Sequence, residues 1–199
     1  MRQITAAVFA LLFALSPAYA QRVWKTDLSH SQVKFSVTHL VIAEVTGKFN
    51  DFEVTLTQTG KDDFAGSSIE ATVKMASIDT DNETRDNHLR SDDFFNAEKY
   101  PVMSFKSTKI EKTGEKMYKI TCTLTIRDVT RTVVLDTRYM GEVKDPRGTM
   151  KSGFKATTSI NRFDYGVKWD KKIEGGGLVV GETVDITLLM EFALQDAKQ

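Results

Sequence analysis

The first residues to weigh are those that could serve as a nucleophile, a base or a metal ligand. Ser29 and His30 are adjacent, and neighbouring side chains on a strand point to opposite faces, so we expect them not to share a proton. His30, His39 and His88 are widely spaced, with no second histidine at i+2 or i+4. This spacing disfavours a zinc site and favours polar histidines at strand ends and on a surface segment.

An acidic run resembles the start of a calcium-binding loop. Asp79, Asp81 and Glu83 occupy alternate positions, as the first ligands of such a loop do. The sixth position is Thr84 instead of glycine, and the twelfth is Arg90 instead of glutamate. We therefore interpret the run as the solvated face of a helix.

Two further features have structural explanations. Gly175-Gly176-Gly177 is rich in glycine, as phosphate-binding loops are, but no Lys-Ser or Lys-Thr follows and a strand comes next, which favours a hairpin turn. Cys122, the single cysteine, occupies an apolar strand position and excludes an intrachain disulfide. These residues indicate no catalytic site, no metal site and no cofactor, and we expect the protein not to be an enzyme.

Period-two alternation of apolar and polar residues dominates the chain and predicts strands with one dry face. The inward residues of about eight strands are Val33, Phe35, Val37; Phe52, Val54, Leu56; Ile69, Ala71, Val73, Met75; Met103, Phe105; Tyr118, Ile120, Cys122, Leu124, Ile126; Val133, Leu135; Phe154, Ala156, Thr158, Ile160; and Val184, Ile186, Leu188, Met190, Phe192. Tight turns at residues 60–63, 113–115 and 145–148 separate neighbours, which favours an all-β antiparallel barrel.

One segment, around residues 80–95, breaks this alternation. Thr80 and Glu83 have the spacing of a capping box, so Thr80 is predicted to be the N-cap of a short helix that ends near Arg90. Phe94 and Phe95 follow on a second turn. We interpret the segment as a helical flap across one end of the barrel.

The first twenty residues differ from the rest. Arg2 is their only charge, an apolar run covers residues 4–15, and Ala18-Tyr19-Ala20 fits a signal-peptidase site. We expect residues 1–20 to be a cleaved export signal, residues 21–199 to form one domain, and the protein to be secreted into the periplasm without a transmembrane anchor. The alternative is an uncleaved anchor. Basic and acidic residues number 27 each, which argues against nucleic acid as a partner.

The barrel interior is the remaining candidate for function. An eight-stranded barrel is just wide enough to be filled by its own side chains or to hold one small ligand. The inward residues are apolar in either case, so periodicity alone leaves a filled core and a ligand channel equally open.

Several segments, in order from Trp24 to about Phe192, resemble the YceI family. They are Ser31-x-Val33-x-Phe35-x-Val37-x-His39-Leu40 with Val45-x-Gly47-x-Phe49; Arg85-Asp86-Asn87-His88-Leu89-Arg90-Ser91-x-x-Phe94-Phe95 with Tyr100-Pro101; Leu124-Thr125-Ile126-Arg127-Asp128-Val129-Thr130-Arg131; Asn161-Arg162-x-Asp164-x-Gly166; and Val180-Gly181-Glu182-x-Val184-x-Ile186. Asp128, Thr132 and Thr183 depart from the glycine, proline and acidic residue common in that family.

The resemblance implies an extended, lipocalin-like, eight-stranded antiparallel β-barrel that binds, stores or transports a polyisoprenoid or related long-chain amphiphilic lipid. Such a lipid would be, for example, a quinone or a polyprenyl phosphate. The expected apolar channel comprises Phe35, Val37, Val54, Val73, Met103, Phe105, Ile120, Leu124, Phe154, Ile160, Ile186 and Leu188. The expected polar head-group site comprises His39, Arg85, His88, Arg90 and Asn161.

Arg85 and His88 lie three residues apart on the predicted helix and therefore share a face that could meet an anionic head group. The alternative for these polar residues is a network that fixes the flap to the barrel. Two other functions stay open: a stress-related structural or partner-binding protein with a filled core, and an enzyme acting on the bound lipid. A homodimer is compatible with each.

Overall fold

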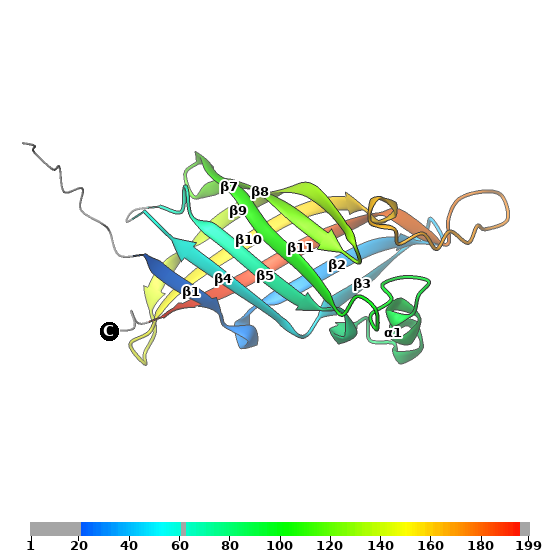
Figure 1. Cartoon of the computed structure of the whole chain (residues 1–199), viewed down its shortest axis with the longest axis horizontal. Coiled ribbons are helices and arrows are strands. Elements are labelled where there is room, and N and C mark those ends of the chain that lie inside the picture. Colours follow the sequence, from blue (N-terminus) through cyan, green and yellow to red (C-terminus); the bar gives the residue numbers. More distant parts are fainter. Residues whose placement is uncertain (1–20, 61–62, 196–199) are drawn as a thin grey trace, which may run out of the picture.

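The computed structural model describes residues 21–60 and 63–195, which form one antiparallel sheet rolled into an elongated barrel (Figure 1). The predicted leader, residues 1–20, lies outside the described residues. The strands are β1 (Arg22–Thr26), β2 (Gln32–His39), β3 (Ala43–Phe49), β4 (Phe52–Gln58), β5 (Ser68–Lys74), β6 (Ile78–Asp79), β7 (Val102–Gly114), β8 (Met117–Ile126), β9 (Val129–Lys144), β10 (Met150–Asn161) and β11 (Val180–Leu194). The helical elements are α1 (Glu83–Arg90) and the 3-10 turns η1 (Leu28–His30), η2 (Met75–Ser77) and η3 (Arg162–Tyr165).

The barrel closes because β1 pairs with strands from both ends of the chain. Trp24 of β1 lies opposite Leu56 of β4 on one side and opposite Leu194 of β11 on the other. The closed ring runs β1-β4-β5-β7-β8-β9-β10-β11 and back to β1. This arrangement confirms the predicted eight-stranded antiparallel barrel.

Three further strands lengthen the wall beyond β1. The last residues of β11 pair with β1, whereas the stretch from Val180 to Leu189 pairs with β2. β2 forms a hairpin with β3, in which Phe35 faces Gly47, and β3 pairs with β6 where Lys48 faces Asp79. The wall is therefore longer on this side than the ring of eight strands alone.

The alternation of β8 shows why these sequences form strands. Tyr118, Ile120, Cys122 and Leu124 are all buried, as predicted from their spacing. Each large apolar side chain gains roughly 1.5–3 kcal/mol when it leaves water, which fixes the face that turns inward. On the outer face, Lys119 pairs with a carboxylate of β9.

The flap begins differently from the prediction. The N-cap of α1 is Asn82, whose side chain accepts a hydrogen bond from Arg85 N at 2.9 Å. Thr80 is buried, and its hydroxyl donates to Asp86 Oδ1 instead. The predicted capping box is wrong because the chain turns at Asp81, which has a positive φ of 58°. The helix ends at Arg90 as expected, and α1 lies at one end of the barrel (Figure 1).

Candidate functional site

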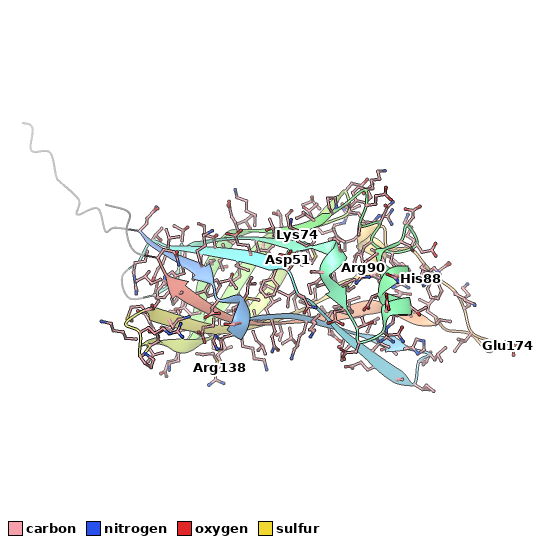
Figure 2. The ribbon with its side chains drawn as sticks, turned by 90° about the horizontal axis from the view of Figure 1, so that it is seen from below. Asp51, Lys74, His88, Arg90, Arg138 and Glu174 are labelled. Atoms are coloured by element: carbon pink, nitrogen blue, oxygen red, sulfur yellow. The ribbon has the colours of Figure 1, made fainter. Side chains whose placement is uncertain are left out.

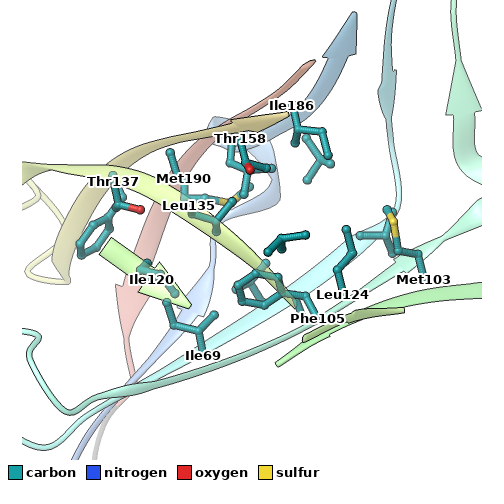
Figure 3. Close-up of a pocket in the computed structure, with 18 of the residues that line it drawn as sticks. Ile69, Met103, Phe105, Ile120, Leu124, Leu135, Thr137, Thr158, Ile186 and Met190 are labelled. Atoms are coloured by element: carbon teal, nitrogen blue, oxygen red, sulfur yellow. The ribbon is translucent and has the colours of Figure 1, made fainter. Parts of the chain in front are cut away.

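An apolar cavity of about 130 Å³ lies in the middle of the barrel (Figure 3). Most residues of the predicted channel line it: Val54, Val73, Met103, Phe105, Ile120, Leu124, Phe154, Ile186 and Leu188. Other inward residues complete the lining, among them Val33, Ile69, Ala71, Val133, Leu135, Thr137, Ala156, Thr158, Met190 and Phe192. An apolar cavity of this size stays dry and accepts apolar ligands, since water finds no hydrogen-bond partners in it.

A second cavity of about 100 Å³ continues toward the flap end. The remaining predicted channel residues line it: Phe35, Val37 and Ile160. Val33, Met103 and Ile186 line both this cavity and the central one, so the two adjoin within the barrel. Leu89 of α1 and Phe94 also line the second cavity, so the flap forms part of its wall.

The opposite end of the barrel is closed by aromatic side chains. Phe64 packs edge-on against Tyr118, Tyr139 and Phe154, with ring centroids 4.9–6.2 Å apart. Only a small cavity of about 30 Å³ lies among them. Trp24 is fully buried nearby and donates its indole hydrogen bond to Gln58 Oε1 at 3.0 Å. Among the residues that the structure describes, the row of cavities is therefore narrowest at this side.

At the flap end the second cavity adjoins an outer pocket of about 530 Å³. The two share Phe35, Val37, Leu89, Phe94 and Val180. His39, Arg85 and His88, three of the predicted head-group residues, line this outer pocket together with Trp169. The outer pocket is thus the polar end of an otherwise apolar row of cavities.

Arg85 and His88 are also fixed by neighbours within the flap. Arg85 donates from Nε to Thr80 Oγ1 at 2.7 Å and from Nη2 to the Thr80 carbonyl at 2.6 Å. His88 Nε2 lies 2.8 Å from Asp93 Oδ2, and its ring stands edge-on to Phe94 and Trp169. Both residues therefore combine the structural role considered above with a position on the pocket wall.

Arg90 and Asn161 lie outside these four cavities. Arg90 donates to the carbonyls of Ala76 and Ile78 and so ties the end of α1 to the barrel. The Asn161 side chain accepts from Phe163 N at 2.9 Å and caps η3. Their contacts favour a structural role over the predicted head-group role.

Arg162 is a charged residue at the channel that the sequence reasoning missed. It is buried and lines the second cavity. Its guanidinium donates to the carbonyls of Gly181, Val167 and Val180 at 2.8–3.0 Å, and burial lowers its pKa. Its place in a segment that resembles the YceI family was the only sequence signal, because a buried arginine has no periodicity of its own.

Ser29 and His30 are closer than the sequence suggested. They lie in η1, a 3-10 turn rather than a strand, with Ser29 Oγ 3.0 Å from His30 Nδ1. The expectation that they cannot interact is therefore wrong. The Ser29 hydroxyl donates to Asp27, however, and the Lys151 ammonium lies 2.6 Å from Asp27 and 3.3 Å from Glu191. The positive charge of the Lys151 side chain therefore already pairs with the two carboxylates in the cluster of Asp27, His30 and Glu191.

Cys122 has the environment of a small apolar residue. Its thiol is fully buried and donates to the Val133 carbonyl. Burial raises its pKa to about 12, so the thiol form dominates at neutral pH. Within the described ranges 21–60 and 63–195, no helix has the length and apolar character needed to cross a membrane.

Comparison with known proteins identifies the family. The family model for the YceI-like domain matches residues 24–192. A UPF0312 protein of Photorhabdus laumondii is 40% identical over 163 residues, which cover 81% of this chain and 83% of that protein. A crystal structure of a Campylobacter jejuni YceI protein is 34% identical, has a TM-score of 0.69, and covers 80% of this chain and 90% of its own.

A more distant structure, described as a polyisoprenoid binding domain from Saccharophagus degradans, is 13% identical with a TM-score of 0.62. It covers 86% of this chain and 98% of its own, and it shares the fold. Because the family model spans nearly all of the described barrel, the chain belongs to the YceI-like domain family.

Proposed function

We propose that the barrel binds a long-chain isoprenoid or a related amphiphilic lipid. The observation that carries this proposal is the row of adjoining apolar cavities, which narrows to its smallest member at Phe64 and adjoins a pocket with polar residues at the flap. Concave, mostly apolar sites with a few polar groups at one end fit ligands of this shape. A relative described as polyisoprenoid-binding supports the same ligand class.

The energetics of burial are sufficient for such a ligand. A buried methylene contributes roughly 0.8 kcal/mol, so a five-carbon isoprene unit contributes about 3–4 kcal/mol before the entropic cost of binding. A few units in the central and second cavities give useful affinity without a specific polar contact. Chain length and head group then determine which lipid is preferred.

The asymmetry of the two ends sets the direction of the ligand. The apolar tail enters first and points toward the closed end at Phe64 and Tyr118, where aromatic rings surround the smallest cavity. The head group stays in the outer pocket beside His39, Arg85 and His88. A quinone or a prenyl phosphate would meet hydrogen-bond donors there.

The proposed role is that of a carrier or reservoir without turnover. The leader predicted for residues 1–20 would direct it to the periplasm, where a lipid with a long apolar chain needs a protein to cover it in water. A lipid that is recovered chemically unchanged after incubation with the protein is the expected result.

The experiment that tests the ligand class is native mass spectrometry of the purified protein, followed by organic extraction. A bound prenyl lipid or fatty derivative at one per chain is expected. A ligand-free mass, together with no uptake of added prenyl lipids, would contradict the proposal and show a filled barrel.

Arg85 tests the direction of the ligand. Arg85→Ala removes a guanidinium from the outer pocket, so the affinity for a prenyl phosphate should fall about tenfold, on the scale of a charge-assisted hydrogen bond. Binding of the uncharged prenol should stay unchanged. This result would also show that the variant is folded. Arg138→Ala, at the opposite end of the barrel (Figure 2), is the control. Unchanged binding of the prenyl phosphate would remove Arg85 from the head-group role.

A further inference from the structure

Three consecutive apolar side chains are exposed where β2 turns into β3. Leu40, Val41 and Ile42 are 39%, 61% and 88% exposed, and residues 40–42 are called the apolar tip below. A single exposed apolar residue is common on protein surfaces and needs no explanation. Three consecutive apolar side chains that stay exposed to water at the end of a hairpin are unfavourable for the isolated molecule, which points to a partner.

The backbone of the apolar tip indicates that these residue types are not there for the fold. Ile42 N donates to the His39 carbonyl at 3.3 Å, and the two central residues, Leu40 and Val41, have φ values of 51° and 66°. A β-turn whose two central residues both have positive φ strongly favours Asn-Gly at those positions. Leucine and β-branched valine are strained in this backbone conformation. Leu40 and Val41 therefore stand, exposed, at positions where Asn and Gly would stabilise the hairpin.

The apolar tip adjoins the mouth of the channel. It follows His39 directly, and Leu40 N donates to the carbonyl of Val179; both His39 and Val179 line the outer pocket. Val41 packs against Gly177, where an added Cβ would lie 3.1 Å from Val41 Cγ2. The loop of residues 170–179 thus lies beside the tip, at the same end of the barrel as α1 (Figure 1).

The neighbouring loop carries amphipathic and basic side chains. Trp169 is half-buried at the rim of the outer pocket, and Lys168, Lys171 and Lys172 are exposed. These three lysines outnumber the carboxylates of Asp170 and Glu174 in the same segment. Tryptophan and lysine are the residues that settle at the boundary between lipid chains and water, and lysines are attracted to anionic head groups.

We propose that this end of the barrel docks on a phospholipid bilayer, with the apolar tip inserted among the lipid chains and the lysines at the head groups. A protein partner is a poorer fit, because a stable interface buries about 800 Å² on each side and three side chains on a convex tip offer far less. This inference rests on the proposed function. Docking would place the outer pocket against the membrane, so that a lipid enters the channel without crossing water.

Insertion of the apolar tip into a bilayer can be measured at single positions with a fluorescent label. Val41→Cys, labelled with an environment-sensitive dye, is compared with Val143→Cys, since Val143 is equally exposed at 63% but lies on β9 toward the opposite end. Cys122 is buried and does not compete for the label. Vesicles of phosphatidylcholine and phosphatidylglycerol in equal parts should shift the emission to the blue at position 41 and leave position 143 unchanged. No shift at position 41, or equal shifts at both, would overturn docking.

A double variant separates docking from ligand binding. Leu40→Asn with Val41→Gly introduces the favoured turn, so the fold should be kept or stabilised while two inserting side chains are lost. Vesicle binding should fall by about a hundredfold or more, because each of the two large side chains buried in lipid contributes at least tenfold. Transfer of prenol from vesicles should slow in parallel, with uptake of prenol added from ethanol unchanged.

The two proposals fail in distinguishable ways. If the double variant binds vesicles as well as the natural chain does, docking by the apolar tip is wrong whatever the channel binds. If the natural chain takes up no prenol from ethanol, the lipid-binding proposal is wrong, and the dye at position 41 still decides the docking question. If the double variant loses uptake from ethanol as well, the tip also shapes the channel, and the dye at position 41 decides the docking question.

Discussion

Filling the central cavity is the sharpest perturbation of the proposed channel. Ala71 lies on β5, opposite Val54 of β4 and Phe105 of β7, and all three line the cavity of about 130 Å³. Ala71→Leu adds three carbon atoms at this point. They occupy space that the proposed lipid chain needs, without touching either end of the channel.

The expected loss of affinity follows from the displaced carbons. Three methylene-sized groups at roughly 0.8 kcal/mol each amount to about 2.4 kcal/mol, or about 50-fold in the dissociation constant. The ligand-free protein should be as stable as before or slightly more stable, because the added carbons fill a void instead of displacing packed atoms. Affinity and stability therefore change in opposite directions.

The assay is titration of prenol into the purified protein, with urea unfolding of the ligand-free form in parallel. The control is Thr72→Leu, on the same strand, because Thr72 is exposed on the outer face. It should leave prenol affinity within twofold of the natural chain. Unchanged affinity in Ala71→Leu would refute the channel, and a loss of stability above 2 kcal/mol would show that the cavity has no room for the added carbons.

Two further predictions concern the barrel wall. Lys151 holds the pKa of Asp27 below its usual range, so ionised Asp27 stabilises the fold above about pH 4 and loses this contribution as the pH falls further. Asp27→Asn should therefore lower the free energy of unfolding in urea by about 2 kcal/mol at neutral pH, and by progressively less in acid. A difference that does not change with pH would contradict this. A Cβ at Gly47 would clash with the Phe35 ring, so Gly47→Ala should lower the free energy of unfolding by about 1–3 kcal/mol. At Gly114 the nearest atom to an added Cβ is 3.6 Å away, so Gly114→Ala should cost less, and equal costs in urea unfolding would refute the steric argument.

Period-two alternation predicted the walls of the barrel well because each inward residue of a long strand is fixed by its neighbours. In β8 every predicted inward residue from Tyr118 to Ile126 is buried. In β10 the predicted residues from Phe154 to Ile160 are buried or half-buried, and the residues between them are exposed. The alternation did not predict β1, because this strand has only five residues and Trp24 is its single buried side chain. Yet β1 is the strand that closes the ring, and only its partners in β4 and β11 reveal that.

The site was predicted where it lies on strands and was incomplete where it lies in irregular segments. The central cavity is lined by strand residues whose direction follows from register. Arg162 belongs to the 3-10 turn η3 and Trp169 to the loop after it, where neither period applies, and they come to the channel only through tertiary contacts. For the same reason Thr80 was taken for an N-cap: its true partner, Asp86, is six residues away.

The dual pairing of β11 has a consequence for how the molecule is made. Three strands, β1, β2 and β10, use β11 as a partner, and Trp24 meets Leu194 across almost the whole described chain. During synthesis, the edges of β1, β2 and β10 that pair with β11 therefore stay unpaired until β11 has been made. Contacts this distant in sequence slow folding to milliseconds or longer and leave strand edges open to other chains meanwhile. A chain interrupted before Val180 has no ring to complete, so the barrel forms as a whole after its last strand is made.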